Sequence, residues 1–151
     1  MSLELDPRID IADAPTIRLA GASYFVPQLV LRQMVKIGPL LPEVIRLTNR
    51  RATALSGLPL DDRGNLLLDD EGRLALVEKL TLSEASMDIA LRVIVAGLTR
   101  AYPAARLDDL YDLPIADSEI VAALTIVVAQ TRSVARAGDA LSAGGAAATS
   151  R

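Results

Sequence analysis

The densest hydrophobic stretch of this chain runs from residue 81 to residue 101, where apolar side chains occupy most positions around a helical turn. Thr81 and Glu84 stand three apart at its start, a spacing typical of a capping box at a helix N-terminus. Pro103 ends the stretch, because proline disfavours the helical conformation in the residue before it. The pattern predicts an apolar helix over 82–101. Such a helix is buried on nearly all sides, so we expect it to be the centre of the fold.

The region before Pro27 has a two-residue period instead. Ile17 and Leu19 alternate with other residues, and Gly21-Ala22-Ser23 separates this run from a second β-rich run. Two such runs joined by a glycine-containing turn predict a β-hairpin over 16–26. A two-stranded hairpin is only marginally stable by itself, so we expect it to lie against the helices or to pair with another chain.

The remaining apolar runs have the helical period, and glycine and proline residues divide them. The predicted helices cover residues 28–37, 42–55, 73–79, 107–111 and 119–135, with Asp117 or Ser118 as the N-cap of the last one. A long polar connector occupies residues 56–72. The predicted fold is therefore mainly α: a bundle of about four helices around the central apolar helix, with one N-terminal β-hairpin.

The length of 151 residues is that of a single domain with a substantial core. The acidic, alternating segment 1–14 does not resemble a signal peptide, and we expect a flexible N-terminal arm there. The globular domain is predicted to span residues 15–137. The Gly/Ala/Ser-rich segment 138–151 has no periodicity and is predicted to be disordered. No stretch is long and apolar enough to read as a membrane span, so we expect a soluble intracellular protein.

The composition removes most catalytic chemistry. The chain contains neither Cys nor His, which leaves no thiol nucleophile, no imidazole base and no thiolate or imidazole metal site. The acidic clusters at 61–65, 69–72 and 108–112 lack the ligand spacing of a calcium loop, and we interpret them as solvated turns and helix caps. No glycine-rich phosphate loop is present. We therefore expect no enzymatic activity, no cofactor, no metal and no small-molecule substrate.

A basic face on the predicted helix 42–55 leaves a nucleic-acid alternative open. Arg46, Arg50 and Arg51 lie close together on this helix and could contact phosphates. The net charge of −3 and the absence of aromatic residues among these arginines argue against it. We expect no nucleic-acid partner, and we keep a small helical nucleic-acid-binding regulator as the second alternative.

The apolar surface predicted for the hairpin and the helices exceeds what one small bundle can hide, and exposed apolar patches commonly mark interaction sites. We expect homo-oligomers or a stable complex with a long helical partner, with contacts through the hairpin and the last helix rather than through the arginine face. The candidate partner-binding residues are Tyr24, Phe25, Leu31, Tyr102, Tyr111, Val121, Leu124 and Val128.

Two stretches carry a family resemblance. Residues 22–33, ASYFVPQLVLRQ, combine the end of a short hairpin with a Tyr-x-Val-Pro segment and a leucine-rich helix bearing an Arg-Gln pair. Residues 98–114, LTRAYPAARLDDLYDLP, place a Tyr-Pro pair after a helix and an acidic leucine-rich turn before the next one. Together they resemble the tail assembly chaperones of long-tailed bacteriophages and prophages, over about residues 15–136.

The resemblance implies a non-enzymatic protein in the cytoplasm of a bacterial host. Such a chaperone coats the tape-measure protein until tail-tube subunits polymerise around it, so its implied partners are the tape-measure and tail-tube proteins. The first alternative is a structural virion protein, such as a tail or head–tail completion subunit, which would also carry no chemistry.

Overall fold

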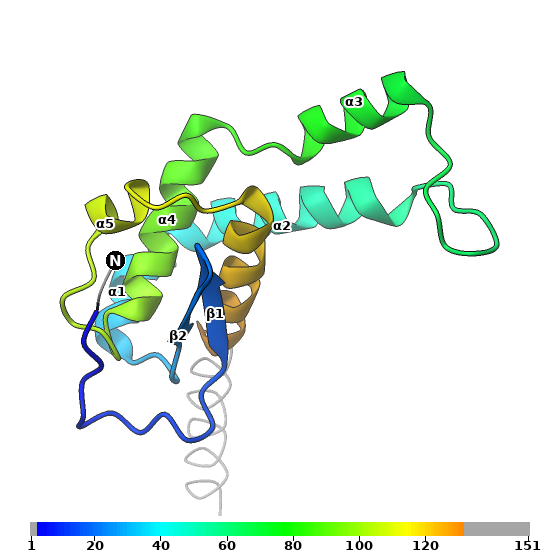
Figure 1. Ribbon diagram of the computed structural model, residues 1–151. Helices are drawn as coiled ribbons and strands as arrows, with labels where there is room; N and C mark the ends of the chain where they lie inside the picture. Colours follow the sequence, from blue (N-terminus) through cyan, green and yellow to red (C-terminus); the bar gives the residue numbers. More distant parts are fainter. Residues whose placement is uncertain (1–2, 132–151) are drawn as a thin grey trace, which may run out of the picture.

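The computed structural model describes residues 3–131, and this part of the chain is mainly helical with one antiparallel hairpin near its N-terminus (Figure 1). The predicted fold class is confirmed. In chain order the elements are β1 (Thr16–Leu19), β2 (Ala22–Phe25), α1 (Leu31–Ile37), the 3₁₀ helix η1 (Gly38–Leu40), α2 (Leu41–Ser56), α3 (Asp70–Leu80), α4 (Glu84–Leu98) and α5 (Leu107–Tyr111). The helix that follows α5 is described over residues 117–131.

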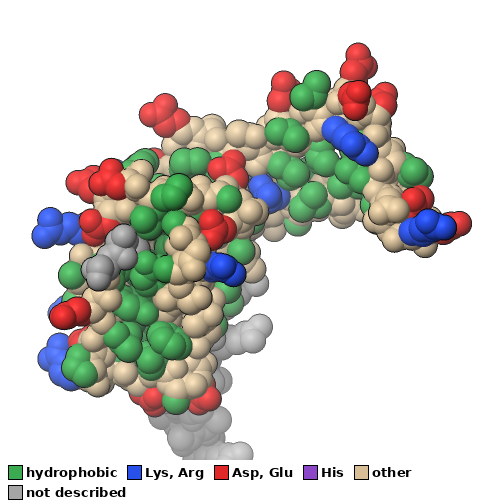
Figure 2. All heavy atoms as spheres, viewed as in Figure 1, with side chains coloured by type: hydrophobic (Ala, Val, Ile, Leu, Met, Phe, Trp, Pro, Cys, Tyr) green, Lys and Arg blue, Asp and Glu red, His purple; other side chains and the backbone are tan. Residues whose placement is uncertain are grey.

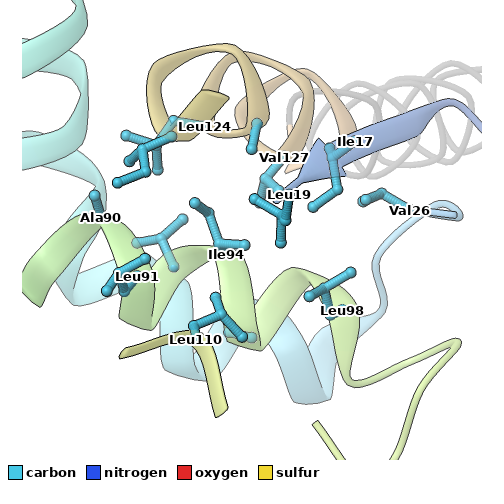
Figure 3. Close-up of a cluster of buried hydrophobic side chains, with 14 of the residues drawn as sticks. Ile17, Leu19, Val26, Ala90, Leu91, Ile94, Leu98, Leu110, Leu124 and Val127 are labelled. Carbon is cyan, nitrogen blue, oxygen red and sulfur yellow. The ribbon is translucent and has the colours of Figure 1, made fainter. Parts of the chain in front are cut away.

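Helix α4 is the centre of the body, as its hydrophobic pattern predicts. Val93, Ile94 and Leu98 on this helix are completely buried. Figure 3 shows Ile94 and Leu98 facing Leu19 of the hairpin and Val127 of the last helix. The core therefore lies between α4, the hairpin and the helix over 117–131.

The predicted capping box at the start of this helix is wrong. Ser83 is the N-cap of α4, and its hydroxyl accepts a hydrogen bond from the Ser86 N–H at 3.1 Å. Thr81 instead ends α3, where its hydroxyl donates to the Val77 carbonyl at 2.7 Å. The two helices follow one another so closely that Thr81 belongs to the earlier one. Helix α4 is consequently shorter at both ends than the predicted range 82–101.

The hairpin begins at the predicted residue but ends at Phe25, one residue before the predicted end, and it has a different turn. Ile17 pairs with Tyr24 and Leu19 with Ala22, so Ala22 already belongs to β2. The turn is formed by Ala20 and Gly21, both with positive φ, as a tight two-residue turn between twisted antiparallel strands requires. The expectation of a turn at residues 21–23 is therefore wrong by one position.

The hairpin lies against the helical body and is attached to it by side chains. The Phe25 N–H donates to the Tyr102 hydroxyl at 2.9 Å, and the Tyr102 and Tyr24 rings meet edge to face with centroids 5.6 Å apart. The Gln130 side-chain amide donates to the Val26 carbonyl at 2.7 Å. These contacts join residues that are between 77 and 104 positions apart in the sequence, and they fulfil the expectation that the hairpin lies on the helices.

The last helix begins two residues earlier than predicted, and its predicted cap is wrong. Ala116 directly precedes it, and the Ala116 N–H donates to the Glu119 carboxylate at 3.2 Å. The Asp117 carboxylate instead accepts from the Leu82 N–H at 3.2 Å and so connects this helix to the start of α4. The predicted end of the helix at residue 135 and the predicted disordered tail 138–151 lie outside the described residues.

The other elements shift by a few residues from their predicted bounds. Helix α1 begins three residues later than expected. Helix α3 begins three residues earlier, because the Asp69 carboxylate caps it by accepting from the Gly72 N–H at 2.7 Å. The segment before the hairpin contacts the body: the Asp6 N–H donates to the Ala101 carbonyl at 2.7 Å, and Leu3 and Leu5 pack against the core.

Candidate functional site

Helices α2 and α3 form a helical arm, residues 41–80, that projects from the body with the tip loop 57–69 at its far end (Figure 1). Helix α2 starts inside the body, where Val44 is completely buried, and then runs outward. Helix α3 returns beside it and has no buried residue. A helix of this length with no buried side chain adds little to the core, so its apolar residues require another explanation.

The base and the tip of the helical arm are held by specific hydrogen bonds. At the base, the Arg51 guanidinium donates to the Leu80 carbonyl at 2.8 Å, which satisfies a carbonyl in the last turn of α3. At the tip, the Asp61 carboxylate accepts from the Asn65 N–H at 2.8 Å and the Arg63 N–H at 2.9 Å. These bonds stabilise the charged form of the Asp61 carboxyl and therefore lower its pKa, and the bond from Asn65 has the larger effect. The arm therefore has a defined shape although it is exposed.

A groove of about 1070 Å³ runs between the two helices of the arm. Its lining residues are Pro42, Ile45, Arg46, Asn49, Arg50, Thr53, Ala54, Gly57, Leu58, Pro59, Leu68, Gly72, Ala75, Leu76 and Lys79. In Figure 2 the hydrophobic side chains of the arm gather between its two helices, on the same face as a few cationic ones. The groove combines an apolar floor with three cations and, along the described lining, no carboxylate.

The cations of the groove differ in their pairing. Arg46 forms an exposed ion pair with Glu43, one turn before it on α2. Within residues 3–131, Arg50 and Lys79 form no ion pair, so their charges remain available to a ligand. The three arginines of the predicted basic face therefore have different roles. Arg46 and Arg50 line the groove, whereas Arg51 forms a hydrogen bond to the last turn of α3.

Most of the large hydrophobic side chains that remain exposed belong to the helical arm. They are Ile45, Leu55, Leu60, Leu67, Leu74 and Val77. The others are found on α1 and the segment before it, apart from Tyr111 on α5. This concentration singles out the arm as an interaction surface.

The structure does not bring the predicted partner-binding residues together on one surface. Four of them are buried in the core, and a partner cannot reach them in this conformation: Tyr24, Tyr102, Leu124 and Val128. Phe25 and Val121 are half-buried, while Leu31 and Tyr111 are exposed on different helices. The helical arm was missed at the sequence level. Its available signal was the pair of helical runs joined by a long polar connector, which is the pattern of a helical hairpin.

Tyr111 has a local partner on α4. Its hydroxyl donates to the Asp88 carboxylate, which also accepts from the Arg92 guanidinium at 2.7 Å. Both hydrogen bonds lower the pKa of the Asp88 carboxyl, and the bond from Tyr111 has the larger effect. The three side chains thereby connect α5 to α4 at the surface of the body.

Replacing Tyr111 with Phe is expected to lower stability slightly at pH 7 and by less at pH 3. A carboxyl whose pKa is lowered in the folded state stabilises the fold above its unfolded pKa of about 3.9, and this contribution is lost as the pH falls through the folded pKa. Urea denaturation of the wild type and Tyr111→Phe at the two pH values measures the difference. A gap between the two proteins that widened towards pH 3 would contradict this account of the Asp88 pKa.

Comparison with known proteins gives no match to a protein-family model, to a curated protein sequence or to a solved structure. Over residues 3–131 the helices are too short or too polar to cross a membrane. Within the same range, His, Cys, Asp and Glu side chains do not gather in groups of three or more that could hold a metal ion.

Proposed function

We propose that this protein is a non-enzymatic assembly chaperone that binds a helical segment of another polypeptide in the groove of its helical arm. The observation that carries this proposal is the apolar, cation-bordered groove on an arm whose second helix, α3, contributes no side chain to the core. Laying an amphipathic helix into an apolar groove is a common mode of peptide recognition. No catalytic group is needed for it.

The dimensions and chemistry of the groove favour a particular kind of helix. Helix α2 has 16 residues and is about 24 Å long, which matches four turns of a partner helix. The apolar floor would cover the apolar stripe of that helix, with a gain of roughly 25 cal/mol for each Å² removed from water. Arg50 and Lys79 favour acidic residues along the edges of the stripe, because charge complementarity selects the partner and its orientation.

The resemblance to tail assembly chaperones suggests which polypeptide this is. We propose the tape-measure protein as the bound partner and the tail-tube protein as the component that replaces the chaperone during assembly, inside the bacterial host. A groove for a helix fits a long helical client. A structural virion subunit would use the same surface but would remain in the finished particle.

Nucleic-acid binding is the second candidate, because Arg46, Arg50 and Lys79 lie within one groove. Phosphate contacts of this kind weaken steeply as salt rises. The apolar floor argues for a polypeptide instead, since phosphates gain nothing from it.

Reversing the charge of Arg50 and Lys79 together is expected to weaken tape-measure binding by about tenfold or more, because two favourable charge contacts become repulsive. The measurement is co-purification and titration with a tape-measure protein, sought among the products of the genes that neighbour the gene for this chain. Arg63→Glu with Arg73→Glu is the matched control, since it makes the same charge change on the arm outside the groove.

Equal binding by the two double variants would contradict the groove as the site. Binding of a 30-base-pair DNA duplex that disappears in Arg50→Glu with Lys79→Glu, in a chain that ignores the tape-measure protein, would replace the proposal with the nucleic-acid regulator.

A further inference from the structure

Two exposed apolar surfaces of opposite charge lie at opposite ends of the molecule, on the outer face of α3 and on α1. We propose that they bind each other between copies of this chain, so that the protein associates head to tail. The contact uses neither the groove nor its ligand, and it stands whether or not the proposed function is right.

The first surface, called the α3 outer face, consists of Asp70, Glu71, Leu74, Val77 and Glu78. Leu74 is 66% exposed and Val77 is 59% exposed. Successive residues of a helix are 100° apart, so Asp70, Leu74 and Val77 point away from the α3 residues that line the groove. Glu71 and Glu78 lie along one side of them and the cation Arg73 along the other, and all five residues of the face are exposed. Figure 2 shows acidic side chains along this outer edge of the arm.

The second surface, called the α1 face, consists of Leu31, Arg32, Val35 and Lys36. Leu31 is 76% exposed and Val35 is 69% exposed, more than the hydrophobic residues of the other surface. Arg32 follows Leu31 and Lys36 follows Val35, so each cation lies about 100° further round the helix than its apolar neighbour. Helix α1 contains no acidic residue. The cations of this surface form no ion pair within the described chain. The α1 face is therefore apolar and basic, whereas the α3 outer face is apolar and predominantly acidic, with three carboxylates and Arg73 at its border.

Charge decides which surfaces meet. Two α3 outer faces would place carboxylates against carboxylates, and two α1 faces would place cations against cations, and such like-charge contacts exclude wrong pairings. The pairing of an α3 outer face with an α1 face joins opposite charges and buries four apolar side chains. Figure 1 shows α3 far from α1, so one chain cannot make this contact with itself.

A contact between two different surfaces leaves one of each unused at the ends of the pair. It therefore repeats, and it generates a ring if the rotation closes and a filament if it does not. Each contact is small, which places it among weak interfaces, so assembly depends strongly on protein concentration. The groove lies on the other side of α3 and stays open in such an assembly, so successive copies could hold successive segments of one client.

Two double variants test the pairing in the full-length chain. Leu74→Gln with Val77→Gln removes the apolar part of the α3 outer face, and Leu31→Gln with Val35→Gln removes that of the α1 face. Glutamine is neutral and a good helix former, so both variants should fold, as thermal melting by circular dichroism would verify. Sedimentation velocity over a concentration series is the measurement.

The expected result has three parts. The average mass of the wild type rises with concentration, and each variant alone loses this rise over the range where the wild type assembles. A 1:1 mixture of the two variants forms dimers and nothing larger, because each variant retains the surface that the other lacks.

Three outcomes would overturn the proposal. A wild type that remains monomeric up to its solubility limit has no such contact. A mixture that remains monomeric shows that the two surfaces do not pair. Assembly that survives the α1 change but not the α3 change shows that two helical arms meet each other instead.

Discussion

Ile94→Asp is expected to abolish cooperative folding near room temperature. Ile94 is completely buried in α4 among the hairpin and the last helix (Figure 3). An unpaired carboxylate there loses its hydration and gains no partner, which costs several kcal/mol at least. The total stability of a domain of this size is about 5–15 kcal/mol, so one such change consumes much of it.

Urea denaturation followed by circular dichroism measures this effect, and Leu67→Asp is the matched control. Leu67 lies in the tip loop and is exposed, so the same kind of change there is expected to alter stability by about 0.5 kcal/mol or less. An Ile94→Asp protein that unfolds cooperatively at the wild-type midpoint would show that α4 is not the core of the fold.

Gly97→Ala is expected to destabilise the protein by about 1–3 kcal/mol, although alanine is the better helix former by about 1 kcal/mol. A Cβ at residue 97 would lie 2.9 Å from both methyl groups of Val127. Val127 is completely buried and β-branched, so it cannot turn aside easily. Helix α4 and the last helix therefore approach each other closely at Gly97.

A double-mutant cycle isolates the clash. Val127→Ala removes both methyl groups, and in that background Gly97→Ala is expected to be neutral or stabilising. The coupling between the two sites should therefore be about 1 kcal/mol or more, within the range measured for residues in contact. Strictly additive effects would mean that the two helices separate at this point without cost.

The elements that could be predicted best have strong local signals. The hairpin follows from the alternation around Ile17 and from the glycine in its turn, and α5 agrees with its predicted range 107–111. In each case the physical cause acts over a few residues, so the sequence contains it.

The helix caps could not be predicted with the same success, because several residues compete for each role. Thr81 and Ser83 are both good N-cap residues, and the choice depends on where α3 ends. Asp117 resembles a cap but bonds to Leu82, a residue distant in the sequence. Tertiary contacts decide which of the competing residues takes the role of the cap. The local spacing of residues carries no information about these contacts.

The candidate site was missed for a related reason. Apolar residues on a helix indicate that some surface covers them, and they do not say whether that surface belongs to the same chain. Leu124 is covered by the core, whereas Leu74 is not, and both occur in helical runs of similar appearance. Only the arrangement in space separates the buried set from the exposed one.

The separation of α3 from the core has a consequence for how this protein can evolve. If the groove binds a client as proposed, changes along it alter recognition while the buried contacts of α4 remain intact, because none of the residues that line the groove is buried. Recognition and foldability are thus carried by different residues. Under the proposed function, the arm adapts to a changing client by single substitutions that cost almost no folding free energy, while the body keeps its sequence.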